Sequence, residues 1–129
     1  MFSFVLHTDS GVPVYVQLVQ QVKNGIRMGQ LQPGDRLPTA KEVVKALAVN
    51  PNTVLKAYRE LEREGLVSPR PGAGTFVRRR LGSASPEGRD RLYAELSDWM
   101  ERAAAEGLDD EDILALFAGA QEARVARRA

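Results

Sequence analysis

The spacing of apolar residues predicts a mostly helical chain with one small β-hairpin. After Pro13, which can open a helix because its missing N–H is not needed there, apolar side chains recur three and four positions apart. They form one amphipathic stripe that ends near Gly29, a good helix terminator. Its members are Tyr15, Leu18, Val19, Val22 and Ile26.

Two further helices follow closely. Thr39 and Glu42 have the spacing of a capping box, in which each side chain satisfies the other's backbone N–H. After a turn of about three residues, Asn50 and Pro51 are a good cap and a good first residue for a longer helix that ends at Gly65. Its inward positions are Val54, Ala57, Tyr58 and Leu61. A short helix, a tight turn and a longer helix are typical of a helix-turn-helix.

After Gly65 the spacing of apolar residues is no longer helical. Residues 66–68 and 75–77 are short β-like runs, and residues 69–74 between them are rich in turn formers. This pattern predicts a hairpin with a loose tip, and residues 35–37 predict one more short strand. A hairpin directly after a helix-turn-helix makes a winged helix.

The rest of the chain is predicted to be a linker followed by a helical hairpin. Residues 81–87 are small and polar, and Ser85 and Pro86 can start a helix that reaches about Gly107. Asp109 can cap the next helix, whose acidic first turn suits the positive end of the helix dipole. We therefore expect a winged-helix domain at 1–80 with its core at 12–80, a linker at 81–87, and a two-helix dimerisation tail at 88–129.

Two helices joined by a tight turn cannot bury both apolar faces alone. The tail is therefore predicted to pair with a second copy into a four-helix bundle. The alternative is that the same side chains pack on the winged helix of their own chain. The predicted seam consists of Leu92, Leu96, Trp99, Leu116 and Phe117.

Composition adds a division of charge. The 129 residues have a net charge of only +1, but residues 1–80 hold 12 Lys and Arg against 6 Asp and Glu, whereas residues 81–129 hold 6 against 11. A basic half joined to an acidic half suggests that only the first meets a polyanion. There are no cysteines, and the first residues lack a basic leader, which together favour a cytoplasmic protein. The apolar run at 113–120 is too short to cross a membrane.

The inventory of reactive residues argues against an enzyme. His7 is the only histidine, and no glycine-rich phosphate loop follows a strand. The acidic residues at 109–112 lack the spacing of a calcium loop, and helix capping explains them. The sequence thus predicts no cofactor and no metal. It does not indicate a small-molecule effector, although it leaves room for one.

Several segments together resemble the winged-helix domain of GntR-family transcription regulators. The resemblance covers residues 12–80 without a gap, and the short two-helix tail is similar to that of the YtrA-like subfamily. It is carried by residues 13–26, 31–47, 49–67 and 71–77. The resemblance implies a homodimeric, sequence-specific DNA-binding repressor whose tail dimerises, and ABC-transporter genes as targets.

The second helix of such a motif enters the major groove with its first turns near the bases. Asn52 suits an adenine edge, whereas Thr53 and Lys56 suit phosphates. At the wing, Arg70 could enter a narrow minor groove, and Gly72 allows a close backbone approach.

Each of these assignments has a structural alternative. Asn50 and Asn52 could simply cap the helix, and Arg70 could be an exposed arginine on a flexible hairpin. Lys41 stands where the family usually has an arginine that contacts a guanine, but a lysine is a point charge without the planar fork, and a solvated surface lysine is the alternative. Pro51 also replaces a polar contact of some relatives. Lys41 and Pro51 support a second hypothesis, a protein-interaction module that kept the winged helix and lost DNA binding.

Overall fold

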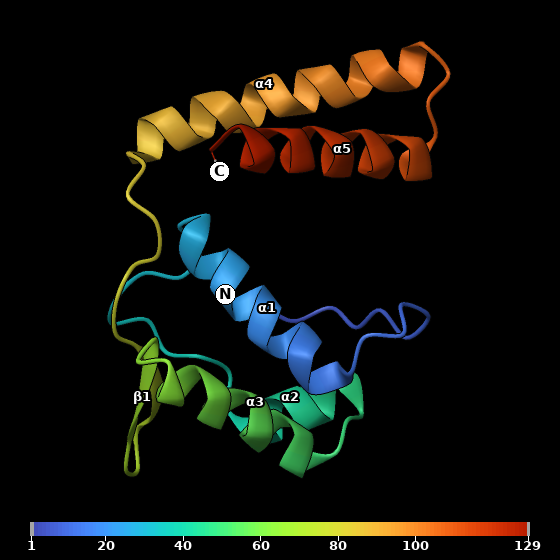
Figure 1. Ribbon diagram of the computed structural model, residues 1–129. Coiled ribbons are helices and arrows are strands. Elements are labelled where there is room, and N and C mark those ends of the chain that lie inside the picture. Colours follow the sequence, from blue (N-terminus) through green and yellow to red (C-terminus); the bar gives the residue numbers. More distant parts are fainter. Residues whose placement is uncertain (1, 129) are drawn as a thin grey trace. The chain divides into compact units, whose positions relative to one another are not determined.

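The computed structural model describes residues 2–128, and Figure 1 shows the path of the chain. Contacts divide the chain into one unit that ends at Ser83 and another that begins at Ala84. The boundary lies inside the predicted linker. The elements in order are α1 (Val14–Arg27), α2 (Ala40–Leu47), α3 (Pro51–Arg63), β1 (Val67–Arg70), β2 (Gly74–Val77), α4 (Pro86–Ala105) and α5 (Asp110–Arg128).

The first unit is built around the apolar faces of α1 and α3. Leu18 and Val22 of α1 and Val54 and Leu61 of α3 have no exposed surface. The helical stripes expected from the sequence therefore form one core, except that Tyr15 lies at its edge and is partly buried. Burying each such side chain stabilises the fold by about 1.5–3 kcal/mol.

The helix caps that the sequence predicts for α2 and α3 are confirmed. Thr39 and Glu42 form the capping box. The Glu42 N–H donates to Thr39 Oγ1 and the Thr39 N–H donates to Glu42 Oε1, each at a distance of 3.1 Å. Asn50 caps α3, and its Oδ1 accepts the Asn52 N–H at 2.8 Å. Between the helices, Ala48 adopts a left-handed conformation with φ of 56°. This conformation ends α2 abruptly and sets the tight turn of the motif.

The hairpin is longer and tighter than expected. β1 and β2 pair antiparallel from Val67 opposite Val77 to Arg70 opposite Gly74. The expectation of a loose tip at 69–74 is wrong, because the Ala73 N–H donates to the Arg70 carbonyl at 2.9 Å and closes a turn over Pro71 and Gly72. Proline followed by a glycine with φ of 75° is the pattern of a type II turn.

Pro69 inside β1 is tolerated because β1 is an edge strand. The far side of β2 bonds to residues 34–37, with the Leu37 N–H donating to the Thr75 carbonyl and the Val77 N–H donating to the Asp35 carbonyl. The strand expected at 35–37 is reduced to a single bridge between Arg36 and Phe76. A proline lacks one ladder donor, so it is found at sheet edges, where that donor would face solvent.

An N-terminal arm, residues 4–12, is fastened to α1 by two glutamines. Gln17 is buried, accepts the His7 N–H at 2.9 Å and donates to the carbonyls of His7 and Val12. Gln21 accepts the Val5 N–H and donates to the Val5 carbonyl. Both side chains thus bind backbone groups of the arm, and Gln17 Nε2 also donates to Ser10 Oγ at 3.3 Å.

Gly25 lies where Phe2 and Leu31 pack closely against α1. A β-carbon there would come within 2.8 Å of Phe2 Cε2 and 3.2 Å of Leu31 Cδ1. The glycine that weakens the helical pattern in the sequence is therefore explained by close packing.

Tyr58 joins α3 to the segment before α2. Its hydroxyl donates to the buried Pro38 carbonyl at 2.5 Å, and burial raises the pKa of Tyr58 well above its usual value, so the hydroxyl remains a donor. We expect Tyr58→Phe to lower the free energy of unfolding by about 1–3 kcal/mol, because the carbonyl loses its partner. Urea denaturation measures this, with Tyr93→Phe, at a tyrosine that is 57% exposed, as the control. Equal stability of both variants would contradict this role of the hydroxyl.

The second unit consists of α4 and α5. Ser85 caps α4, with its Oγ accepting the Gly88 N–H. Asp109 and Asp112 cap α5 reciprocally, since Asp109 Oδ1 accepts the Asp112 N–H at 2.8 Å and Asp112 Oδ2 accepts the Asp109 N–H at 3.0 Å. The capping interpretation of this acidic cluster is therefore confirmed.

Most of the apolar surface of this unit is exposed. Of its apolar side chains only Ala103 and Ile113 are buried among the residues described. Of the predicted seam, Trp99 is half-buried, and the other four side chains are between 47% and 59% exposed: Leu92, Leu96, Leu116 and Phe117. Tyr93, Met100, Leu114 and Val125 are exposed as well. Between residues 2 and 128, no helix combines the length and the apolar character that a membrane span requires.

Candidate nucleic-acid interface

The two asparagines at the start of α3, Asn50 and Asn52, have different roles. The Asn50 side chain is used as the cap, so this alternative holds for Asn50. Asn52 contributes only its backbone N–H to that bond, and its exposed side-chain amide has no hydrogen bond within residues 2–128. An amide with a free donor and a free acceptor at the head of this helix can form two hydrogen bonds with a base edge.

Lys56 follows one turn later and is held by α1. Its Nζ lies 3.9 Å from the centroid of the Tyr15 ring, which is a cation–π contact. Thr53, three positions before Lys56, is half-buried. Residues three and four apart share a helix face, so Lys56 lies next to both Asn52 and Thr53. The lysine charge is thereby kept beside the polar first turn of α3.

The wing presents an arginine whose position is also fixed. The Arg70 guanidinium carbon lies 4.3 Å from the centroid of the Phe76 ring, on the neighbouring strand. Arg70 is the last residue of β1, and Gly72 is exposed at the tip of the turn that follows. Stacking on Phe76 limits the conformations that Arg70 samples, so less entropy is lost when it binds a ligand.

Arg36 was not singled out from the sequence, although it joins the wing to α2. Its Nη1 lies 3.3 Å from Glu42 Oε1, and a β-carbon at Gly74 would come within 3.2 Å of Arg36 Cδ. The pKa of Glu42 is lowered below its usual value. The main cause is its hydrogen bonds with the backbone and side chain of Thr39, and the Arg36 guanidinium makes a smaller contribution. The only sequence signal was the short strand at 35–37, which gives no information on where its side chains lie.

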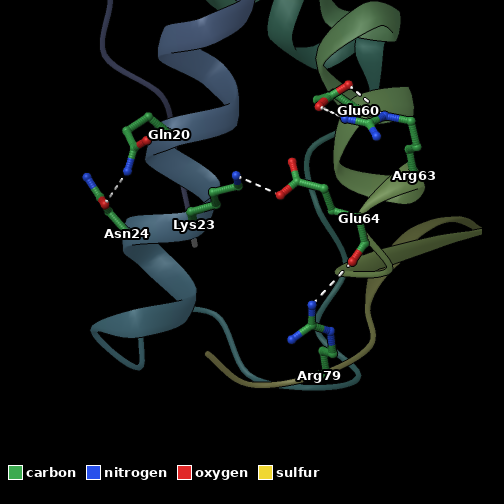
Figure 2. A network of polar contacts seen from close by, with 7 residues as sticks. All are labelled: Gln20, Lys23, Asn24, Glu60, Arg63, Glu64 and Arg79. Atoms are coloured by element: carbon green, nitrogen blue, oxygen red, sulfur yellow. Dashed lines mark hydrogen bonds and ion pairs between the residues drawn. The ribbon is translucent and has the colours of Figure 1, made fainter. Parts of the chain in front are cut away.

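The opposite end of α3 is anchored by a separate polar network, shown in Figure 2. Lys23 of α1 forms an ion pair with Glu64 over 2.9 Å, and Arg79 Nη2 donates to the Glu64 carbonyl at 3.2 Å. Glu60 pairs with Arg63 one turn earlier. An arginine bound to a terminal carbonyl satisfies one of the free acceptors at the helix end. This network fixes the C-terminal end of α3 relative to α1 and leaves the first turn of α3 free.

Lys41 completes the set of residues predicted from the sequence. It is exposed in the first turn of α2, and no interaction of its side chain occurs within residues 2–128. The predicted DNA-contacting residues thus occupy three places of the first unit: the first turn of α2, the first two turns of α3, and the wing. Among the residues described, no group of three or more acidic or histidine side chains is placed to hold a metal ion.

The model of the family "Bacterial regulatory proteins, gntR family" matches residues 14–77, from the start of α1 to the end of the wing. The chain is 40% identical over 86 residues to the HTH-type transcriptional repressor YtrA of Bacillus subtilis, a match that covers 67% of this chain and 66% of YtrA. It is 35% identical to the transcriptional regulator YhcF of the same organism, over 82% of this chain and 88% of YhcF.

The chain belongs to the GntR family of bacterial regulatory proteins. Solved structures agree with this family assignment. YtrA from Sulfolobus acidocaldarius, a GntR-family transcription factor, superposes with a TM-score of 0.54 and 30% identity, covering 73% of this chain and 95% of that one.

The predicted fold, a winged helix-turn-helix followed by a helical tail, is confirmed. As a GntR-family member the chain is a DNA-binding transcription regulator, and this family is not one of enzymes. A DNA-bound relative is also known: the DNA-binding domain of AraR in complex with operator ORE1, with a TM-score of 0.50 and 30% identity, covers 60% of this chain and 94% of that one.

Proposed function

We propose that the chain is a homodimeric repressor that binds a near-palindromic operator. The observation that carries this proposal is the free polar first turn of α3, with Lys56 held beside it by the Tyr15 ring, together with Arg70 held on the wing by the Phe76 ring. In this assignment Asn52 contacts a base edge, whereas Lys41, Thr53 and Lys56 bind in the major groove or to its phosphates. Arg70 and Gly72 approach the minor groove.

The exposed apolar face of the second unit supports a dimer. Eight large apolar side chains of α4 and α5 are more than 40% exposed, an amount that monomers seldom leave unpartnered. A second copy offers the same apolar face, and two helical hairpins can close a four-helix bundle. Two-fold symmetry then places two copies of α3 on half-sites one helical turn, or a multiple of it, apart.

The similarity to repressors named YtrA and NagR favours repression. The YtrA-like resemblance extends the proposal to ABC-transporter genes as targets. Genome-wide footprinting of the bound sites tests both points. If the full chain binds no fragment upstream of its own gene or of the footprinted genes at low salt, the proposal is wrong.

Asn52 and Lys56 are expected to affect binding in different ways. Asn52→Ala should cost about 1–3 kcal/mol against the preferred base pair at one operator position and leave other positions unchanged. Lys56→Ala should weaken binding to all duplexes by a similar factor, because a phosphate contact carries no sequence information. Fluorescence anisotropy on a set of single-base operator variants measures both effects.

Two control variants sharpen this comparison. Lys56→Arg keeps the charge over the Tyr15 ring and should bind like the wild type. Asn50→Asp keeps the cap and should also leave sequence preference unchanged. The two assigned roles would be wrong if Asn52→Ala lost affinity equally for all operator variants. They would also be wrong if Lys56→Ala lost affinity at one operator position only.

A further inference from the structure

One large apolar side chain is exposed on the helix that carries the candidate DNA contacts. Leu55 of α3 is 39% exposed, and it is the only large apolar side chain so exposed among the described residues of α2, α3 and the wing. It is not part of the core cluster. A single exposed leucine is ordinary on a protein surface, so its location decides whether it has a role.

Leu55 lies on the polar face of α3. It follows Asn52 by three positions and precedes Arg59 by four, so all three side chains project from neighbouring parts of one helix face. Asn52 and Arg59 are both exposed, whereas Val54 and Tyr58 point into the core. An apolar group is thus placed between polar groups, in the first two turns of the helix.

The major groove has one apolar group that such a side chain can recognise. Thymine presents its C5-methyl group there, whereas the other base edges present hydrogen-bond donors and acceptors. Leucine has neither donor nor acceptor, so it distinguishes base pairs only through apolar contact. Contact with the methyl group would remove both apolar surfaces from water.

We propose that Leu55 contacts the C5-methyl group of a thymine and is a specificity-determining residue of this chain. This assignment rests on the proposed DNA-binding function and adds to it a preference for one base. Burial of one methyl group corresponds to about a fourfold gain in affinity, which is enough to select a thymine over cytosine at one position of each half-site.

Replacement of thymine by deoxyuridine removes only the methyl group and so tests the proposal directly. The parent duplex is the tightest binder that the full chain selects from a random pool. Each thymine is then replaced in turn, and the dissociation constants of wild type, Leu55→Ala and Leu55→Met are measured by fluorescence anisotropy. Val16→Ala is the matched control, because Val16 of α1 is 36% exposed and lies outside the recognition helix.

We expect the wild type and the control to lose about fourfold in affinity at one thymine of each half-site. Leu55→Ala should bind the parent duplex about fourfold more weakly and show no loss at that thymine, whereas Leu55→Met should keep the sensitivity. Because Leu55 is outside the core, circular dichroism melting should be unchanged in these variants.

Two other outcomes are distinguishable. If Leu55→Ala keeps the same uracil-sensitive positions as the wild type, or if no position is sensitive in the wild type, Leu55 does not contact a methyl group and this proposal is overturned while DNA binding stands. If no duplex from the pool is bound, the proposed function fails, and this proposal fails with it.

Discussion

A chain carrying Phe117→Asp is expected to sediment as a monomer and to bind its operator about 10²–10⁴-fold more weakly than the wild type. Phe117 of α5 is 59% exposed in the single chain and belongs to the seam proposed for the dimer. A carboxylate there would have to be buried without a partner, which opposes association. Each winged helix would then bind its half-site alone and lose the high effective concentration that linkage provides.

The control for this variant is Val5→Asp. Val5 of the N-terminal arm is also 59% exposed, and its attachment to Gln21 uses the backbone. The Val5→Asp chain should remain dimeric and bind the operator like the wild type. Sedimentation equilibrium gives the oligomeric state, and anisotropy gives the affinity. A Phe117→Asp chain that stays dimeric would place the seam elsewhere, and a monomer with full affinity would show that one half-site suffices.

The second large effect is that of salt. With Lys41, Lys56 and Arg70 from each of two copies on the DNA, about six cations together displace counterions from the duplex. Affinity should then fall by roughly 10³-fold between 50 and 200 mM salt, with a slope of log Kd against log salt near 5. A protein-interaction module that binds through apolar contacts would show almost no such dependence. Salt titration thus separates the two hypotheses that the sequence left open.

Single substitutions make the salt measurement specific. Lys56→Ala removes one cation from each copy and should lower the slope by about 2. Arg128→Ala removes an exposed cation at the end of α5, in the acidic half of the chain, and should leave the slope unchanged. Equal slopes for the wild type and Lys56→Ala would remove Lys56 from the DNA contacts.

Features that depend on neighbours in the sequence were predicted well. The capping box at Thr39, the cap at Asn50 and the cap at Asp109 all form as expected. Each involves side chains within three residues of the backbone group that they bind, so the order of residues determines the geometry.

Features that depend on distant packing were missed. The extent of β1 could not be predicted, because Pro69 is acceptable only if the outer side of β1 stays unpaired, and the sequence does not show that residues 34–37 bond to β2 instead. The contact of Lys56 with Tyr15 requires α1 and α3 to pack side by side. Likewise, Arg79 was part of an arginine run with no distinguishing mark, and only the folded chain brings it to the end of α3.

The two glutamines of α1 have a consequence for how relatives of this chain diverge. Gln17 and Gln21 bind backbone groups of Val5, His7 and Val12, whose side chains are all exposed. The arm can therefore change its amino acids at these positions while keeping the same path. In evolutionary terms, positions 5, 7 and 12 can drift, while the constraint that preserves the arm falls on positions 17 and 21, inside a helix.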